Sequence, residues 1–197
     1  MKHPLVLAFL LVFPCVPYAQ PAGPEGSAQR KFISGGTIRL HLESGGYTIT
    51  PTDPENIIVT CRSRSGQQLK TVKVSIKTTP STAYVYVTNT PRGNFNADIE
   101  VPRRSNLWIR LTAGELIVGN VEGDKDLELN AGRLQVDIPR PQEYGHRDAS
   151  VTTGSIEASA FDISKGGLFR SFSQQGPGKY RLHAYVIAGE IDLRGSI

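Results

Sequence analysis

The densest group of side chains able to bind a ligand lies between residues 143 and 147. Glu143, Tyr144, His146 and Arg147 supply a carboxylate, a phenol, an imidazole and a guanidinium in this short segment. Such groups form hydrogen bonds and stack on flat ligands, so together they suit a sugar or a peptide. Binding residues also concentrate on loops that a rigid scaffold holds. We therefore take these four residues as the candidate binding site, with an ordinary polar insertion loop as the favoured interpretation of the segment.

Catalysis by carboxylates would need acidic side chains that converge on one face. Glu115, Glu157 and Glu190 each follow a glycine closely, and they could form an acidic ladder if their segments stack. Arg133 stands directly after Gly132 and interrupts such a ladder. We therefore predict a solvated face without catalytic residues, and a polysaccharide-active enzyme is the alternative.

Two other kinds of chemical site find little support. Ser155 follows a glycine but lacks the sharp elbow motif that presents a nucleophilic serine. Asp124 and Asp126 offer the hard oxygen ligands that Ca²⁺ prefers, but Lys125 separates them and no aspartate repeat follows. We predict a polar turn there, no metal ligand and no cofactor.

A glycine-centred pattern that recurs along the chain must position these residues. Each copy reads as an apolar residue, two small or polar residues, glycine, one further residue, and then an apolar and polar alternation of period two. This is typical of a short strand entered through a glycine bend. The copies are centred on Gly114, Gly132, Gly154 and Gly189.

The spacing of these glycines favours stacked strands. Successive glycines lie 18, 22 and 35 residues apart, so the first two intervals match one turn of a β-solenoid and the last allows two. A degenerate copy over residues 163–169 could fill the longer interval. Stacked turns bury each other's apolar edges. The apolar residues two places after each glycine should therefore form one buried column, made of Leu116, Leu134, Ile156 and Ile191.

The N-terminal half favours antiparallel strands. Residues 72–76 and 83–87 alternate around a short turn at 79–81, and Gly35 and Gly45 begin imperfect copies of the repeat. We predict an all-β fold, namely a β-solenoid or β-helix-like stack of short strands with an N-terminal antiparallel region. A β-sandwich is the alternative. The aromatic residues Tyr84, Tyr86 and Trp108 are assigned to core or cap packing.

The first residues predict export. A short basic start precedes an apolar run over residues 5–12, and Ala19 supplies a small residue for cleavage. The run is shorter than the roughly 20 residues that span a bilayer. We therefore predict a signal peptide at 1–19, a disordered leader at 20–31 and one domain at 32–197, located in the periplasm or outside the cell.

Charge and cysteine content limit the partners. The formal net charge of +4 comes from scattered Lys and Arg residues, which does not resemble the basic stripe of a nucleic-acid-binding protein. We expect no nucleic-acid partner and, after signal removal, no transmembrane segment. Cys61 then remains as a single cysteine, predicted to be a half-buried strand residue without an internal disulfide.

Five segments follow one another in an order that is typical of a known family. They are Asp98–Pro102, Leu107–Arg110, Ala113–Val118, Val121–Asp124 and Ala131–Val136. In this order they resemble the putative adhesin family, and residues 180–182 and 188–193 resemble its closing turn. The resemblance covers about residues 32–197. It implies an exported bacterial β-solenoid domain of uncharacterised function, with no catalytic residues to transfer.

These observations lead to one expected function and two alternatives. We expect an exported, non-enzymatic β-solenoid that serves as an adhesin-like or envelope-associated interaction or scaffold module. Its partner would be a protein or a glycan. A carbohydrate-active enzyme of β-helix type is one alternative, and an envelope protein that binds a small ligand is the other.

Overall fold

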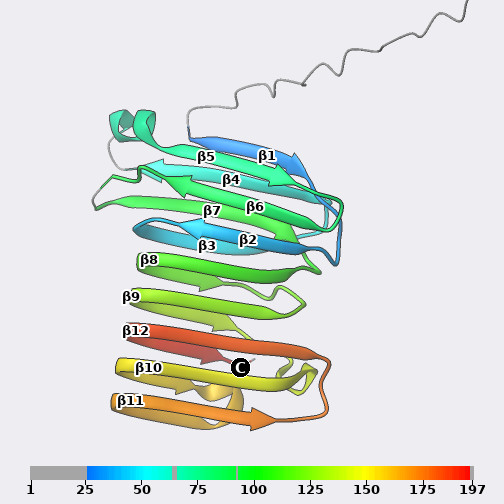
Figure 1. The fold of residues 1–197 in the computed structure, drawn as a ribbon, viewed down its shortest axis with the longest axis vertical. Coiled ribbons are helices and arrows are strands. Elements are labelled where there is room, and N and C mark those ends of the chain that lie inside the picture. The colour runs from blue at the N-terminus through cyan, green and yellow to red at the C-terminus, as the bar shows by residue number, and fades with distance from the viewer. Residues whose placement is uncertain (1–25, 64–65, 92, 196–197) are drawn as a thin grey trace, which may run out of the picture.

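The computed structural model describes residues 26–63, 66–91 and 93–195. This part of the chain forms a single sheet of 12 strands, and its few helical residues form only short 3₁₀ turns (Figure 1). The all-β prediction is therefore confirmed. The elements are β1 (Ser27–Lys31), β2 (Thr37–Leu42), β3 (Gly45–Thr52), β4 (Asn56–Ser63), η1 (Gly66–Thr71), β5 (Lys73–Thr78), β6 (Thr82–Thr88), β7 (Phe95–Pro102), β8 (Asn106–Val118), β9 (Lys125–Asp137), η2 (Pro141–Glu143), β10 (Tyr144–Ala158), η3 (Ser159–Phe161), β11 (Ile163–Gln175) and β12 (Tyr180–Arg194).

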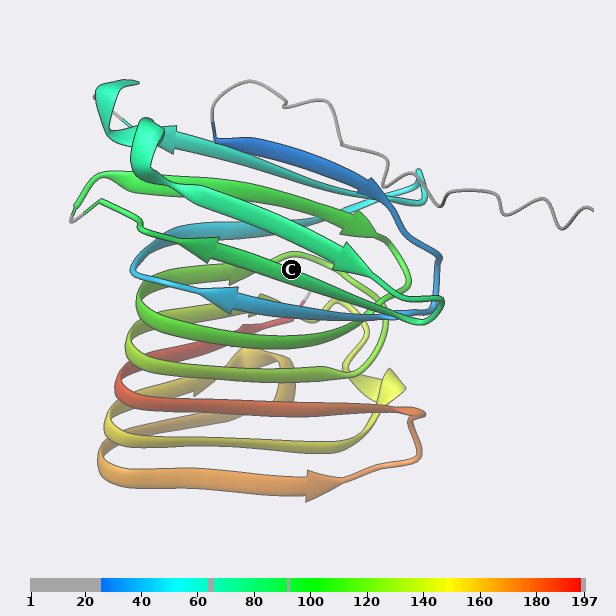
Figure 2. The same cartoon turned by 45° about the horizontal axis from the view of Figure 1, so that its top comes forward.

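The long strands β8, β9, β12 and β10 bend at a glycine and stack in parallel. Figure 2 shows each bent strand running along one side of the molecule and returning along the other. We call these two parts the first limb, before the glycine, and the second limb, after it. The register puts the glycines in one column, in the order Gly45, Gly114, Gly132, Gly189 and Gly154.

Glycine is needed in this column for two reasons. Gly132 has a φ of 125°, a conformation that residues with a side chain rarely adopt. A Cβ at the same position would also lie 1.8 Å from the carbonyl oxygen of Gly114 on the strand above. Any side chain here would push the two turns apart.

Apolar side chains fill the space between the two limbs. The predicted column is present, extended at its N-terminal end by Tyr47, and all of its members are at most 1% exposed. Burial of one such aliphatic side chain contributes about 1.5–3 kcal/mol, so the column is a main source of stability. Its other members are Leu116, Leu134, Ile191 and Ile156.

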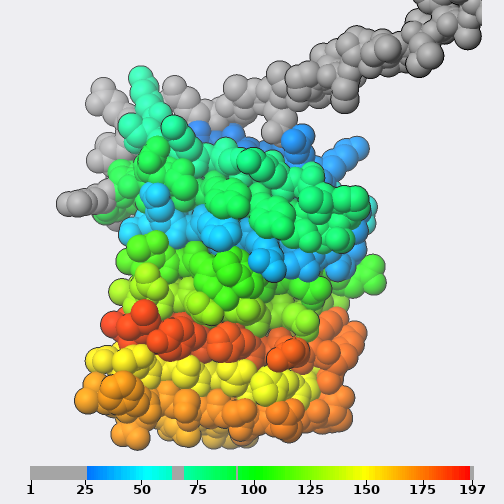
Figure 3. Space-filling model, viewed as in Figure 1, coloured from blue at the N-terminus to red at the C-terminus, as the bar shows by residue number. Residues whose placement is uncertain are grey.

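The C-terminal strand lies inside the stack. β12 pairs in parallel with β9 on one side and with β10 on the other, so chain order and spatial order differ. The red band of β12 between β9 and the yellow β10 shows this insertion (Figures 1 and 3). The stack is therefore continuous only when the last strand is in place.

The structure corrects two predictions about the ends of the domain. The predicted leader at 20–31 is wrong for Ser27–Lys31, which form β1 and pair antiparallel with β4. These residues are polar, but Ala28 packs on the core and the backbone gains partners along β4. The signal peptide at 1–19 and residues 20–25 lie outside the described residues.

The degenerate copy at 163–169 is also not a parallel turn of the stack. It belongs to β11, which runs antiparallel to β10 with Gly167 opposite Gly154. Leu168 and Phe169 are 61% and 79% exposed, so the apolar residues after the glycine point away from the interior. β11 therefore ends the stack.

The N-terminal region contains both antiparallel and parallel pairs, so the prediction of an antiparallel region holds only for part of it. β5 pairs antiparallel with β6, around the predicted turn, whereas β2 pairs in parallel with β6. Cys61 on β4 is more buried than predicted, with 6% exposure, and its thiol is free. Burial raises the pKa of this thiol to about 11. Within the described ranges, no helix is long and apolar enough to cross a bilayer.

Candidate functional site

Side chains that point away from the core line up across the first limbs of the stack. Strand alternation leaves every second residue on this surface, which we call the outer face. One row consists of Tyr84, Arg39, Trp108, Asp126, His183 and Asp148, and the next of Tyr86, His41, Arg110, Glu128, Tyr185 and Ser150. Aromatic, cationic, acidic and imidazole groups therefore lie side by side although they come from distant parts of the chain.

Three rings at the N-terminal end of the outer face form an aromatic cluster, namely His41, Tyr86 and Trp108. The His41 ring stacks on Tyr86 with 4.8 Å between centroids and 7° between planes, and lies 4.9 Å from Trp108. The Arg110 guanidinium carbon is 3.9 Å from the centre of the Trp108 ring. Burial, and then the charges of Arg110 and Arg39, lower the pKa of His41, so this imidazole is neutral at neutral pH.

Tyr84, Tyr86 and Trp108 were predicted to pack in the core or in a cap, and the prediction of core packing is wrong. All three are half-buried on the outer face. The reason is the alternation, because their neighbours Val85 and Ile109 take the interior positions. The aromatic rings thus remain partly available to a ligand.

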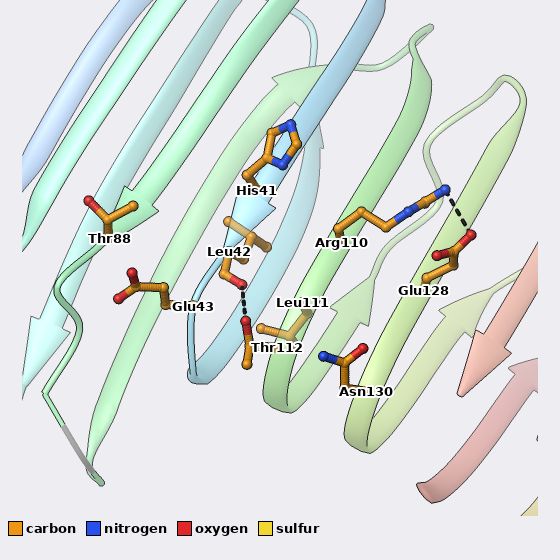
Figure 4. Close-up of a pocket in the computed structure, with 9 residues that line it drawn as sticks. All are labelled: His41, Leu42, Glu43, Thr88, Arg110, Leu111, Thr112, Glu128 and Asn130. Atoms are coloured by element: carbon orange, nitrogen blue, oxygen red, sulfur yellow. Dashed lines mark hydrogen bonds and ion pairs between the residues drawn. The ribbon is translucent and has the colours of Figure 1, made fainter. Parts of the chain in front are cut away.

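A shallow polar groove of about 250 Å³ lies beside the aromatic cluster (Figure 4). It is lined by His41, Leu42, Glu43, Thr88, Arg110, Leu111, Thr112, Glu128 and Asn130. Both carboxylates in it have protein partners, because Glu43 accepts a hydrogen bond from the Thr90 N–H at 3.2 Å and Glu128 pairs with Arg110 at 2.9 Å. The groove thus offers hydroxyl, amide and charged groups next to aromatic rings, which suits hydrogen bonding combined with stacking.

The four residues predicted as a binding site do not come together. β10 begins at Tyr144, and its register with β12 shifts between Tyr144 and His146, so these two residues do not share the face on which simple alternation would place both. Tyr144 is buried in the core, whereas His146 lies at the outer face within 3.2 Å of Asp148. Glu143 pairs with Arg140 at 3.0 Å, and the Arg147 guanidinium lies over the Phe161 ring at 4.7 Å. Ligand binding by these residues stays a prediction.

Lys125, treated in the sequence as part of a polar turn, is one of the largest fully buried side chains. Its Nζ donates hydrogen bonds to the Val121 carbonyl at 2.6 Å, to the Gly123 carbonyl at 3.3 Å and to the Tyr144 hydroxyl. Burial lowers the pKa of Lys125 to about 7, because charge is costly away from water. Burial raises the pKa of Tyr144. The Lys125 side chain therefore connects the turn to the core.

The two possible Ca²⁺ ligands beside Lys125 have separate partners. Asp124 accepts a hydrogen bond from the Arg181 N–H at 2.9 Å, while Asp126 pairs with Arg110 at 2.8 Å. The post-glycine ladder on the second limb is interrupted by Arg133, which lies between Glu115 and Glu190 in register and is 3.6 Å from the Glu190 carboxylate. Neither arrangement forms the acidic site considered from the sequence.

Glu157 lies outside that ladder. It stands opposite Asp192 in register, whereas Glu190 stands opposite Ser155. The three glutamates considered as a ladder thus occupy two different rows.

Comparison with known proteins finds a solved structure with a similar fold but does not assign the chain to a family. No protein-family profile matches the chain, and no curated protein sequence matches it. A solved structure described as a putative cell adhesion protein from Clostridium sporogenes is similar, with a TM-score of 0.54 and 12% identity. The match covers 86% of this chain and 99% of that one. At this identity the likeness establishes the fold alone. The adhesin-like label is supported only as far as a shared fold supports it.

Proposed function

We propose that the protein is an exported, non-enzymatic β-solenoid that acts as an adhesin-like module and binds a glycan on its outer face. The observation that carries the proposal is the aromatic cluster beside the polar groove. Sugar rings present flat C–H surfaces and many hydroxyls, which match aromatic faces next to hydrogen-bonding groups. The predicted signal peptide and the cell-adhesion description of the structural neighbour support the same reading.

The architecture supports a scaffold role. Parallel turns with their glycines in register create a long, flat array of outward side chains, as in solenoid proteins that bind extended partners. Stacked arrays of this kind hold ligand-binding groups at fixed spacing. The repeat thus supplies rigidity, and the outer-face residues that differ between turns supply recognition.

Binding is favoured over hydrolysis by the state of the groove carboxylates. A glycosidase needs one carboxylic acid that holds a proton and a second carboxylate placed across the scissile bond. In the groove, Glu128 is paired with Arg110 and Glu43 accepts a backbone hydrogen bond, so both carboxylates already have protein partners. A carbohydrate-active enzyme is therefore the weaker proposal.

Trp108 is the single tryptophan of the chain, so its fluorescence reports directly on the proposed site. Titration of the mature protein with a panel of soluble oligosaccharides and solubilised envelope glycans should give a saturable change in emission for at least one of them. His41→Ala should weaken that binding several-fold. Gln135→Ala on the second limb is the control and should bind normally, because it leaves the outer face intact.

Three results would count against this proposal. Saturable binding to an envelope protein, with none to any glycan, would replace the ligand class. Equal affinities of the wild-type protein and His41→Ala would move the site elsewhere. Shortening of a polysaccharide during the incubation would favour the enzyme.

A further inference from the structure

A second cluster of functional groups lies on the outer face, toward the C-terminal end of the stack. We propose that Asp126, Glu128 and His183 form a Zn²⁺ site. One candidate ligand atom from each residue lies within 4.8 Å of the others. β9 supplies both carboxylates and β12 the imidazole, and the two strands are neighbours with His183 opposite Asp126. The inference does not depend on the proposed glycan function.

The imidazole is oriented for metal binding by a carboxylate behind it. Nδ1 of His183 lies 2.5 Å from Oδ2 of Asp148 on β10, so Nδ1–H donates to that carboxylate and the lone pair of Nε2 is left for a metal. Histidine ligands in metalloproteins almost always donate their other ring N–H to a carboxylate, a backbone carbonyl or water, which fixes the tautomer and increases the basicity of the ligand nitrogen.

The orienting carboxylate is itself held in place. Oδ1 of Asp148 lies 3.2 Å from Nε2 of His146, whose Nδ1 is 2.6 Å from the side-chain nitrogen of Gln175 on β11. β10 and β11 thus contribute one connected set of polar contacts behind His183. Such an arrangement restricts the ring before any metal arrives, which lowers the ordering cost of binding.

The identity of the donors favours zinc over the hard cations. One imidazole nitrogen and two carboxylate oxygens are common Zn²⁺ ligands, and a water molecule would complete four-coordination. Ca²⁺ takes six to eight oxygen ligands. The three proposed ligands are partly exposed, so the fourth position would face solvent.

Arg110 would compete with the metal for the two carboxylates. Its guanidinium bridges the two carboxylates, at 2.8 Å from Asp126 and 2.9 Å from Glu128, and its carbon lies 3.9 Å from the Trp108 ring centre. The single positive charge of the guanidinium contacts both carboxylates, so the cation must displace it from them. Stacking on Trp108 gives the displaced guanidinium a place to remain.

Calorimetric titration of the untagged mature protein with ZnCl₂ tests this site. One Zn²⁺ should bind per chain, His183→Ala should abolish binding, and Asp148→Asn should weaken it about 10- to 100-fold. Arg110→Gln should tighten binding, whereas a merely structural ion pair predicts no gain. Glu128→Gln should weaken binding, and Glu157→Gln, an exposed carboxylate on the second limb, is its matched control.

Binding that survives His183→Ala would overturn the proposal, because it would place the metal elsewhere. Absence of binding to the wild-type protein at millimolar Zn²⁺ would overturn it equally. If Arg110→Gln fails to tighten binding, the competition with the guanidinium is refuted. Circular dichroism of each variant separates a lost site from a lost fold, and these substitutions lie on the surface.

Discussion

The buried Lys125 makes the stability of the protein depend on pH in an unusual direction. Its pKa falls from the ordinary 10.5 to about 7 in the folded state. Between these values the unfolded chain binds more protons than the folded chain, so the free energy of unfolding rises with pH. Integration from pH 7 to pH 9 gives a gain of about 2 kcal/mol.

Other buried groups oppose the effect of Lys125 on the free energy of unfolding at higher pH. Burial raises the pKa of Cys61 from its usual 9.0 to about 11, so between these values the folded state retains a proton that the unfolded chain loses, and Cys61 offsets the gain from Lys125 as pH rises through 9. The buried tyrosines Tyr47 and Tyr144 act in the same direction at still higher pH, because burial raises the pKa of each. From pH 7 to 9 the contribution of Lys125 is therefore the larger of the two.

Urea denaturation at pH 7 and pH 9, at constant ionic strength, measures the effect. The wild-type protein should be about 2 kcal/mol more stable at pH 9, which corresponds to a rise in melting temperature of about 4–8 °C for a domain of this size. Lys125→Met should remove the rise, whatever its effect on absolute stability. A wild-type protein that loses stability over this interval, or an unchanged rise in Lys125→Met, would refute the reasoning.

The fold makes three further predictions about stability. Gly132→Ala should cost about 2–6 kcal/mol in urea denaturation, since its Cβ meets the Gly114 carbonyl at 1.8 Å, while Gly166→Ala should be neutral because open space surrounds it; equal costs would contradict the stacking argument. Leu134→Ala should cost about 2–5 kcal/mol by leaving a cavity in the central column, and a cost below 1 kcal/mol would show that the column is not the core. Removal of β12 should abolish the cooperative calorimetric transition, since it separates β9 from β10, and a retained transition would mean that these strands do not need it.

Local features of the fold were predictable because they depend on residues that are neighbours in the sequence. Period-two alternation and a glycine at each bend indicate strands, and the shared offset of Leu116 and Leu134 from their glycines indicates a column. The position of β12 was not predictable, since its alternation fits equally well beside any other turn. β1 was missed because Ser27–Lys31 have almost no apolar residue.

The candidate sites depend on which strands pair and in what register, so they could not be predicted from the sequence. His183 and Asp126 are far apart in the chain and meet only because β12 inserts beside β9. His41 reaches Trp108 because β2 lies in parallel against β8. Conversely, the cluster at 143–147 looked like one site because its residues are adjacent, whereas strand alternation separates His146 from Arg147 and the register shift in β10 separates Tyr144 from His146.

The outer face as a binding surface is the central claim, and the affinity of Trp108→Ala for the glycan identified by fluorescence tests it most directly. Isothermal titration calorimetry avoids the need for the missing fluorophore. A central aromatic contact contributes about 2 kcal/mol, so the account predicts a loss of about 30-fold relative to the wild-type protein, with Gln135→Ala unchanged. An affinity of Trp108→Ala equal to that of the wild-type protein would contradict it.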